Sequence, residues 1–505
     1  MEFRRSAGVL LHPTSLPGKF GIGELGSEIY NFIDFLKHSG QTLWQVFPLG
    51  PTGYGDSPYQ CFSAFAGNPL LISIESLLKE KLLTEDDLTE LPGFDPNIID
   101  YGSIIPAKTK LLKKAFANYK SNGSGLKDKI ELFNNNNKEW LDDFALFMAC
   151  KNYHNGVQWS QWEKEIAFRE EGAVKKWNEK LADEIEYQKF AQYKFYEQWT
   201  EVKKYANEND IKIIGDLPIF IAYDSSDLWA NKGLFSVNQE TGKLETVAGV
   251  PPDYFSATGQ LWGNPLYKWE VMKADNFEWW KKRFSQMYEL IDIVRIDHFR
   301  GFEAYFEIPG DAQTAIKGKW LKAPGIELFT EIKKSLGDLP IIAEDLGVIT
   351  KEVEELRDMF NFPGMKILQF AFGEEGDKGF LPHNHSKNCV VYSGSHDNDT
   401  TRGFFENEKN VGSGIYEWAQ KYLNYYGEDM CGAVVNAAYA SVADTVVIPM
   451  QDLLNLGTEA RMNFPGKLGG NWTWRFTWEQ IPTQLPSKLN EMANIYERDH
   501  KEKTK

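Results

Sequence analysis

The sequence has little cysteine and no long apolar run. Four cysteines are scattered over 505 residues, and no two of them form a CxxC pair. This usage argues against a zinc knuckle and against a disulfide framework. No window approaches the roughly 18 to 20 apolar residues of a membrane span, and residues 1–15 lack the longer apolar stretch and the cleavage site of a signal peptide. We therefore expect a cytoplasmic protein without a membrane partner.

An excess of positive charge is also lacking. The chain has 55 lysines and arginines against 72 acidic residues, a formal net charge of -17. This balance argues against nucleic acid as a partner and against a polybasic membrane surface. Aromatic residues, by contrast, are abundant: they make up 14% of the chain and include 16 tryptophans. They indicate either a large aromatic core or platforms that stack on flat apolar faces of a ligand.

Short β-branched runs recur along the whole chain, and helical patterns lie between the later ones. Runs that are apolar on nearly every residue are typical of strands buried on both faces of a parallel sheet. Eight such strands alternating with helices predict an α/β fold, a (β/α)8 or TIM barrel. The predicted strands are Gly8–His12, Thr42–Pro48, Ile211–Asp216, Ile291–Asp297, Pro340–Asp345, Met365–Phe370, Cys389–Ser393 and Thr445–Pro449. The predicted helices beside them are Ser27–Ser39, Glu327–Leu336, Thr350–Met359 and Gly432–Ala443.

Two gaps between the predicted strands are too long for simple crossovers. We interpret residues 51–210, after the second strand, as a largely helical insertion, with several helices over Lys127–Asn209 and a loop tip at Asn134–Asn137. Residues 221–290, after the third strand, predict an ordered loop and one helix over Trp269–Leu290. Insertions that follow barrel strands lie on the active-site face. The chain is therefore predicted to be one catalytic domain, residues 1–505, suited to an extended substrate.

Acidic residues lie at or just after the carboxyl ends of three predicted strands, where barrel enzymes place catalytic groups. They are Asp297, Glu344 and Asp397. Arg295 precedes Asp297 by two residues, so both side chains are predicted to point into the barrel. A packed core does not need carboxylates at these places, because burying an unpaired charge is costly. Catalytic carboxylates are favoured; a Mg²⁺ or Zn²⁺ site and a structural ion-pair network around Arg295 are the alternatives.

Motifs of several other enzyme classes are missing. Neither GxxxxGK[ST] nor GxGxxG occurs between a strand and a helix, and the GxSxG elbow of serine hydrolases is absent. Carboxylates without these motifs suit the chemistry of glycosidic bonds, which needs one acid/base and one nucleophile or base. Aromatic residues of the insertions fit stacking on sugar rings, namely Tyr54, Tyr59, Tyr254, Phe255, Trp262 and Tyr267.

A series of motifs in a fixed order is more specific than any one of them. The series comprises Gly8–Pro17 (GVLLHPTSLP), Tyr54–Tyr59 (YGDSPY), Gly215–Phe220 (GDLPIF), Gly249–Ser256 (GVPPDYFS), Gly259–Tyr267 (GQLWGNPLY), Arg295–Gly301 (RIDHFRG), Ala343–Gly347 (AEDLG), Ser395–Thr400 (SHDNDT), Arg461–Gly466 (RMNFPG) and Asn471–Trp474 (NWTW). With these motifs the sequence resembles 4-α-glucanotransferases of the amylomaltase type, glycoside hydrolase family 77, over nearly the whole chain. The resemblance is to the shorter form of the family.

The resemblance implies a retaining transfer of α-1,4-glucan segments to the 4-hydroxyl of glucose or of another α-1,4-glucan. Asp297 is implied as the nucleophile that forms a β-glucosyl-enzyme, and Glu344 as the general acid and then the base. Asp397 is implied to hold the 2- and 3-hydroxyls in the transition state. Glu344 then needs a raised pKa and Asp297 has to stay ionised beside Arg295. No cofactor and no metal are implied, and the partners are maltooligosaccharides and related α-1,4-glucans.

Further residues are implied as sugar binders, each with a structural alternative. Gly249–Ser256 resembles a lid over the site, and His12 is either close to the site floor or a structural histidine. Two other functions stay open: an α-1,4-glucan hydrolase of the α-amylase type, and a glucan-binding protein without activity. The implied substrate-binding residues are Ser57, Tyr59, Asp216, Gln260, Trp262, Arg295, His298, His396 and Asn463.

Overall fold

A computed structural model describes residues 4–122, 124–252, 256–373, 378–467 and 469–499. Its centre is a parallel sheet with the strand order β10-β11-β12-β1-β2-β3-β6-β9. The sheet is nearly closed, because the N–H of Ala343 at the end of β9 donates to the carbonyl of Pro363 just before β10, at 2.9 Å. The predicted barrel is thus confirmed. The strands are β1 Ser6–Leu10, β2 Leu43–Val46, β3 Lys212–Pro218, β6 Ile293–Asp297, β9 Ile341–Ala343, β10 Gly364–Ile367, β11 Cys389–Tyr392 and β12 Thr445–Pro449.

The barrel strands are short because each is buried on both faces and ends where polar residues begin. Every residue of β12 is buried, as is every residue of β11. Helix α1, Ser27–His38, shows how the outer layer packs: Ile29, Phe32, Ile33 and Leu36 form its buried face at helical spacing. Each such side chain contributes roughly 1.5 to 3 kcal/mol of burial free energy.

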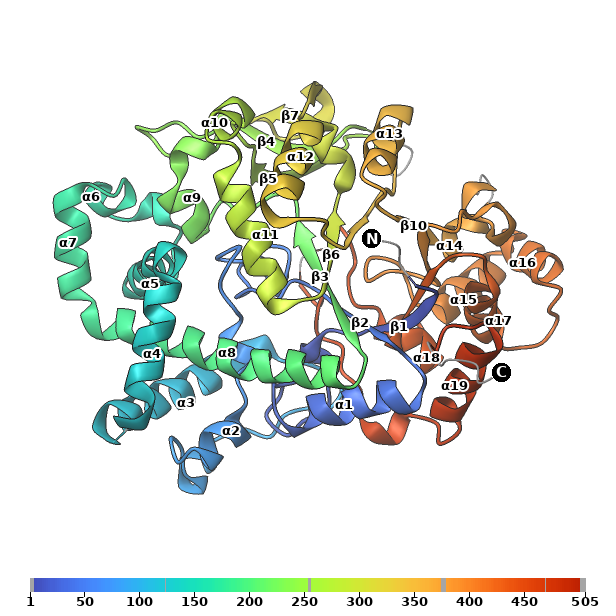
Figure 1. Cartoon of the computed structure of the whole chain (residues 1–505), viewed down its shortest axis with the longest axis horizontal. Coiled ribbons are helices and arrows are strands. Elements are labelled where there is room, and N and C mark those ends of the chain that lie inside the picture. Colours follow the sequence, from blue (N-terminus) through green and yellow to red (C-terminus); the bar gives the residue numbers. More distant parts are fainter. Residues whose placement is uncertain (1–3, 123, 253–255, 374–377, 468, 500–505) are drawn as a thin grey trace.

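Helices fill the long connection between β2 and β3. Figure 1 shows α3 to α7 reaching away from the barrel, while α8 runs back to it, where it contacts α1 and β3. The several helices predicted over Lys127–Asn209 are present. The loop tip predicted at Asn134–Asn137 is largely wrong: α4 continues through Asn136, and only Asn137 separates it from the next helix. The helices are α2 Ile74–Lys79, α3 Tyr101–Asn122, α4 Ser124–Asn136, α5 Lys138–Tyr153, α6 Lys164–Ala167, α7 Glu171–Lys180 and α8 Ala182–Glu208.

A second sheet, not predicted, lies at one end of the barrel (Figure 1). It is antiparallel with the order β5-β4-β7-β8. Two of its strands fall in the connection 221–290, where only a loop and a helix were expected. β4 pairs with β5 inside this connection, but its other partner, β7, comes from a later part of the chain, so the local pattern does not mark the whole sheet. The strands are β4 Thr246–Val250, β5 Gln260–Pro265, β7 Ala304–Pro309 and β8 Lys319–Lys322.

The helix predicted over Trp269–Leu290 is two helices, α10 (Trp269–Ala274) and α11 (Glu278–Leu290), after the short α9 (Ser226–Ala230). Asn276 and Phe277 have φ angles of 57° and 58°. A right-handed helix cannot continue through such residues. The side chain of Asp275 accepts the N–H of Glu278 at the start of α11. The pattern was helical on both sides of this break, which is why one helix was expected.

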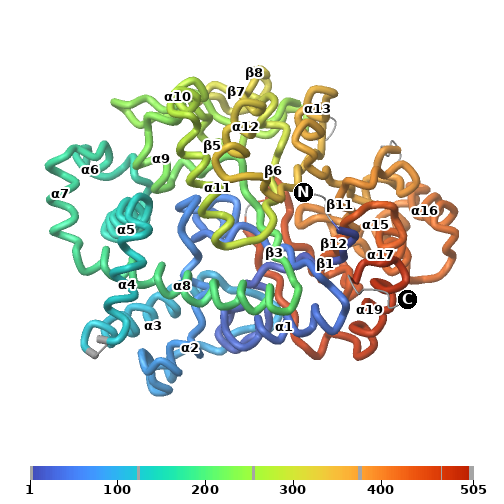
Figure 2. The backbone as a smooth tube through the Cα atoms, viewed as in Figure 1, coloured from blue at the N-terminus to red at the C-terminus, as the bar shows by residue number. Residues whose placement is uncertain are grey.

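Helices α15 to α17 and α19 lie on the side of the barrel away from α3 to α7, as the tube view in Figure 2 shows. The four helices predicted beside strands are present as α1, α12, α13 and α17, with ends within a few residues. The strand predicted over Met365–Phe370 ends earlier, at Ile367, where α14 begins. The remaining helices are α12 Gly325–Leu336, α13 Lys351–Met359, α14 Leu368–Ala371, α15 Thr401–Val411, α16 Ile415–Leu423, α17 Met430–Ala440, α18 Met450–Leu453 and α19 Leu485–Ile495.

None of the helices in the described parts of the chain is long and apolar enough to cross a membrane. The division of residues 1–505 into a barrel with insertions at 51–210 and 221–290 stays a prediction.

What the fold contributes to function is the position of the strand ends. The carboxyl ends of β3, β6 and β9 are neighbours in the sheet, so side chains that follow them meet at one edge of the barrel.

Candidate active site

A buried ion-pair network occupies the ends of β3 and β6. Arg295 is almost completely buried, and its Nη1 lies 2.5 Å from Asp216 Oδ2 and 3.4 Å from Asp297 Oδ1. Asp216 is fully buried, whereas 30% of the Asp297 side chain is exposed. Strand pairing places Asp216 beside Arg295. One guanidinium therefore joins a fully buried carboxylate to a partly exposed one.

Asp216 is held from two further sides. The hydroxyl of Tyr59 donates to its Oδ2 at 2.5 Å, and the Gln45 amide approaches its Oδ1 at 3.4 Å. Tyr392 donates in turn to the Gln45 carbonyl oxygen at 2.8 Å. Because these partners come from β2, β11 and the loop after β2, the network fixes Arg295 from across the barrel.

Glu344 follows β9 directly and is held by backbone donors. The N–H of His298 donates to its Oε2 at 2.6 Å, and the N–H of Leu346 donates to its Oε1 at 3.1 Å. His298 adopts a left-handed φ of 54° just after β6. The N–H of Phe299 donates to the main-chain carbonyl of Glu344. The turn that follows Asp297, the last residue of β6, thus also positions Glu344.

The two carboxyl groups have different proton affinities. Burial raises the pKa of Asp297 to about 6, although the charge of Arg295 lowers it. Burial also raises the pKa of Glu344, to about 8, against the opposing effect of Arg295 and with a further increase from the negative charge of Asp297. Near neutral pH Asp297 is therefore largely ionised while Glu344 keeps its proton. One group is suited to act as a nucleophile and the other as an acid.

Asp397 stands on a loop, not at a strand end. Half of its side chain is exposed. Asn463 donates its amide N–H to Oδ1 at 2.6 Å, and Arg461 donates to the main-chain carbonyl of Asp397 at 2.6 Å. The charges of both Arg295 and Asp397 influence Asp297. The C-terminal segment that carries Asn463 therefore aims the third carboxylate at the same site.

Aromatic rings line the site beside this loop. His396 is buried and stacks on Tyr59 with ring centroids 5.0 Å apart; Phe47 and Trp472 meet it at 4.9 and 5.7 Å. His12 lies behind them, stacked on Phe47, and its Nδ1 accepts the N–H of Phe47 at 3.2 Å. Burial lowers the pKa of His12 to about 3. His12 is thus a structural histidine, and it also lies close to the site, so both alternatives given for it describe its position.

A second aromatic group lies on the Glu344 side. Trp262, half-buried on β5, meets the ring of His298 edge-on at 4.8 Å, and its indole N–H donates to Gln260 at 3.0 Å. Burial, with a smaller effect of Arg300, lowers the pKa of His298 to about 4, so its ring is neutral. The predicted neighbours Gln260, Trp262 and His298 are therefore brought together.

The aromatic residues that were expected to stack on sugar rings differ in their burial and position. Tyr267 is buried and its hydroxyl donates to the carbonyl of Ile219, so its predicted role on a sugar ring is wrong: it is a core residue. Tyr54 is exposed. Tyr254 and Phe255, and with them the centre of the predicted lid Gly249–Ser256, lie outside the described residues. The Ser57 hydroxyl accepts the N–H of Tyr59 at 3.2 Å.

Three comparisons with known proteins agree. A family model described as 4-alpha-glucanotransferase matches residues 11–481. The chain is 49% identical to a 4-alpha-glucanotransferase of Synechocystis over 98% of each chain, and 46% identical to one of Thermus thermophilus over 99% of this chain and all of that one. The amylomaltase of Streptococcus agalactiae, solved with acarbose, superposes with a TM-score of 0.94 at 42% identity, covering 98% of this chain and 100% of that one. The chain belongs to the 4-alpha-glucanotransferase family.

Membership of the 4-alpha-glucanotransferase family makes the chain an enzyme and favours transfer over hydrolysis, because full-length relatives share the transferase description. It also leaves no support for a binding protein without activity. Among the described residues no group of three or more His, Cys, Asp or Glu side chains could hold a metal ion.

Some residues of the site were not predicted from the sequence. Gln45 and Phe47 lie in the second strand run, and Tyr392 in the seventh, where each looks like an ordinary core residue. Trp472 and Arg461 belong to motifs of the family series, but nothing in their spacing shows that they meet the Asp397 loop. Only the closure of the barrel, which brings β1, β2 and β11 near one another, places these side chains at the site.

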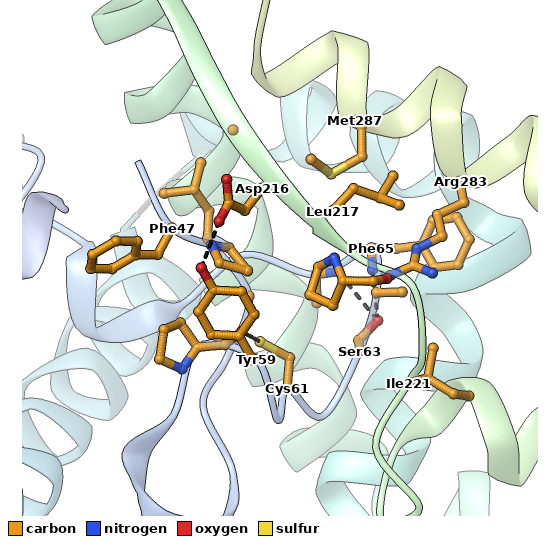
Figure 3. A pocket seen from close by; sticks show the side chains of 18 of the residues that line it. Phe47, Tyr59, Cys61, Ser63, Phe65, Asp216, Leu217, Ile221, Arg283 and Met287 are labelled. Atoms are coloured by element: carbon orange, nitrogen blue, oxygen red, sulfur yellow. Dashed lines mark hydrogen bonds between the residues drawn. The ribbon is translucent and has the colours of Figure 1, made fainter. Parts of the chain in front are cut away.

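A small cavity lies beneath Tyr59. Figure 3 shows Tyr59 and Asp216 joined at one end of it, and Met287, Arg283 and Ile221 around the other. Its volume is about 60 Å³ and its lining is largely apolar. A cavity of this size holds only a few water molecules. The cavity is therefore too small for a sugar ring.

Proposed function

We propose that the chain transfers segments of α-1,4-glucans to the 4-hydroxyl of glucose or of another α-1,4-glucan, with retention at the anomeric carbon. The observation that supports this most directly is the pair at the ends of β6 and β9. Asp297 and Glu344 share a turn, and their pKa values of about 6 and 8 give one ionised and one protonated carboxyl near pH 7.

In the first step Asp297 attacks C1 of a glucosyl residue while Glu344 gives its proton to the departing glycosidic oxygen. The C1–O bond breaks as the bond from C1 to Asp297 forms, which leaves a β-glycosyl ester and a shortened glucan. In the second step Glu344, now ionised, accepts the proton of an incoming 4-hydroxyl, whose oxygen displaces Asp297 from C1. Retention by this route predicts carboxyl groups about 5 to 5.5 Å apart.

The other residues of the site hold sugar in this proposal. Asp397, open to solvent and fixed by Asn463, accepts hydrogen bonds from the 2- and 3-hydroxyls of the reacting sugar. His396, with Tyr59 behind it, and His298, with Trp262 beside it, line its two sides. Ser57 and Gln260 contribute further contacts along the glucan. Arg295 and Asp216 act mainly by keeping Asp297 ionised and in place.

Maltotriose as the only substrate tests transfer against hydrolysis. Transfer yields glucose together with a ladder of longer and shorter maltooligosaccharides, resolved by anion-exchange chromatography. Hydrolysis, the alternative, yields glucose and maltose with no product longer than the substrate, and that result would contradict the proposal. Adding labelled glucose extends the test, because the proposed acceptor role predicts that label enters the maltooligosaccharides.

We also infer that the enzyme works in the cytoplasm without a metal ion. All four cysteines are free thiols, and three of them are buried, which suits a reducing compartment. The three acids Asp297, Glu344 and Asp397 each already have a catalytic or sugar-binding role in the proposal. Treatment with a chelator is therefore expected to leave the rate of maltotriose conversion unchanged. A loss that one specific divalent ion restores would contradict this inference.

A further inference from the structure

The third carboxylate depends on a loop for its position. Residues 394–400, here called the Asp397 loop, connect the end of β11 to the start of α15. Ser395 and Asn398 bond to each other within the loop, at 2.8 and 2.9 Å. These internal bonds set its shape, but they do not attach it to the barrel.

One buried carboxylate bonds to both ends of this loop. Asp452 lies on α18, just after β12, and is 4% exposed. Its Oδ2 accepts the hydroxyl of Ser393, the residue before the loop, at 2.6 Å. Its Oδ1 accepts the N–H of Thr401, the residue after the loop, at 2.7 Å, and its Oδ2 also accepts the Thr401 hydroxyl at 2.6 Å.

Gln369, on the short helix α14 after β10, also bonds to the loop. Its amide N–H donates to the carbonyl of Asp399, within the loop, at 2.8 Å and to the Thr401 hydroxyl oxygen at 3.3 Å. A Cβ at Gly394 would lie 2.6 Å from the same amide nitrogen, so a side chain at this position would displace the Gln369 amide. The Thr401 hydroxyl thus donates a hydrogen bond to Asp452 and accepts one from Gln369.

We propose that Asp452 is a positioning residue for the transfer reaction: it holds the two ends of the Asp397 loop together, so that Asp397 meets the 2- and 3-hydroxyls of the reacting sugar. An ionised carboxylate can accept all three bonds at once, because both of its oxygens are acceptors. The proposal rests on the proposed function, since it needs Asp397 to act on those hydroxyls. Asp452 itself does not touch the substrate.

The chemistry of the three bonds predicts a graded series of variants. Asp452→Ala leaves two buried hydroxyls and one buried N–H without an acceptor. Asp452→Asn keeps an oxygen for the Thr401 N–H, and its amide N–H can donate to the hydroxyls, so it is expected to restore part of the function. Ser393→Ala and Thr401→Val each remove one hydroxyl from one end of the loop. Asp227→Ala removes another carboxylate that is 4% exposed, away from the loop, and serves as the matched control.

The test compares two donors, α-maltosyl fluoride and its analogue without the 2-hydroxyl on the reacting sugar, with glucose as acceptor and fluoride release as the signal. Wild-type enzyme prefers the complete donor in kcat/KM. Asp397→Asn is expected to reduce that preference about 100-fold, and Asp452→Ala about tenfold. Asp452→Asn, Ser393→Ala and Thr401→Val are expected to reduce it less, and Asp227→Ala not at all.

A purely structural role of Asp452 would lower kcat/KM for both donors equally and leave the preference unchanged, which would overturn the proposal. If Asp452→Ala does not fold, Ser393→Ala and Thr401→Val decide: an unchanged preference in both overturns it as well. If Asp397→Asn itself keeps the full preference, the role of Asp397 in the proposed function is wrong and the positioning role is wrong with it. A reduced preference in Asp397→Asn but not in the Asp452 series refutes the positioning role alone.

Discussion

The two sides of the barrel mouth hold their carboxylates in different ways. On one side Asp297 is the last residue of β6 and Glu344 follows β9 directly, and a buried arginine and backbone N–H groups fix them. On the other side Asp397 lies on a loop, half exposed, and side chains of the C-terminal segment fix it. Groups that transfer protons or form covalent bonds to the substrate need burial, because burial shifts their pKa values. A group that only accepts hydrogen bonds from sugar hydroxyls has to be reachable by the substrate, and a position on an exposed loop makes it so.

The largest expected effect is on the strand side. Asp297→Ala removes the nucleophile, so kcat for transfer from maltotriose is expected to fall on the order of 10⁵-fold. The melting temperature should change little or rise, because a partly buried charge is removed. Asp292→Asn, at the opposite end of β6, is the control. Asp292 accepts the N–H of Ile213 at 2.8 Å, so its loss should lower the melting temperature and spare kcat. Near-normal transfer by Asp297→Ala would refute the assignment.

On the loop side the expected loss is smaller. Asp397→Asn keeps the shape of the side chain and its contact with Asn463, but it weakens the acceptor for sugar hydroxyls. We expect kcat/KM for maltotriose to fall about 10³-fold, with only a small shift of the acid limb to lower pH, because the charge of Asp397 raises the pKa of Asp297 slightly. If Asp397→Asn instead shifted the pH profile as strongly as a change at Arg295, Asp397 would belong to the ionising pair, and the contrast between the two sides would be wrong.

Arg295 tests the electrostatic part of the comparison. In the wild type, kcat/KM should fall below about pH 6, as Asp297 gains a proton, and above about pH 8, as Glu344 loses its own. The guanidinium lowers the pKa of both groups, so Arg295→Met should move both limbs to higher pH and reduce the maximum about 100-fold. Arg295→Lys keeps the charge and should hold the limbs nearer their original places. The measurement is kcat/KM between about pH 5 and pH 10; limbs that stay fixed in Arg295→Met would contradict the prediction.

Trp262 should give the smallest effect, because it contacts neither reacting group. Trp262→Ala removes a ring that packs on His298 and faces the proposed glucan path. We expect KM for maltotriose to rise about tenfold with kcat nearly unchanged, as for the loss of one aromatic contact. Trp418→Ala on α16 removes a more exposed tryptophan far from this group and should leave KM unaltered. Equal KM values for the two variants would show that Trp262 only anchors its loop.

The fold could be predicted where local pattern and burial agree. All eight barrel strands were found because each is apolar along its length, and Asp297 and Glu344 were found because acids stand out directly after such strands. The antiparallel sheet was missed because β4 pairs with β7, more than fifty residues later in the sequence. The break at Asn276 and Phe277 was missed because backbone torsions at two ordinary residues leave no mark in a hydrophobic pattern.

The sequence by itself determined the barrel, the order of its strands, the residues that follow them and, through a long series of motifs, the family. Those features depend on short stretches of chain, each with its own periodicity and end signals. Only the tertiary structure decided which groups share a charge, a ring contact or a hydrogen bond. Gln45, Tyr59, Asp216 and Tyr392 form one network, and Asp452 holds a loop fifty residues earlier, because the closed barrel brings distant segments together. The proton affinities of Asp297 and Glu344 follow from that enclosure, since burial and one shared arginine set them.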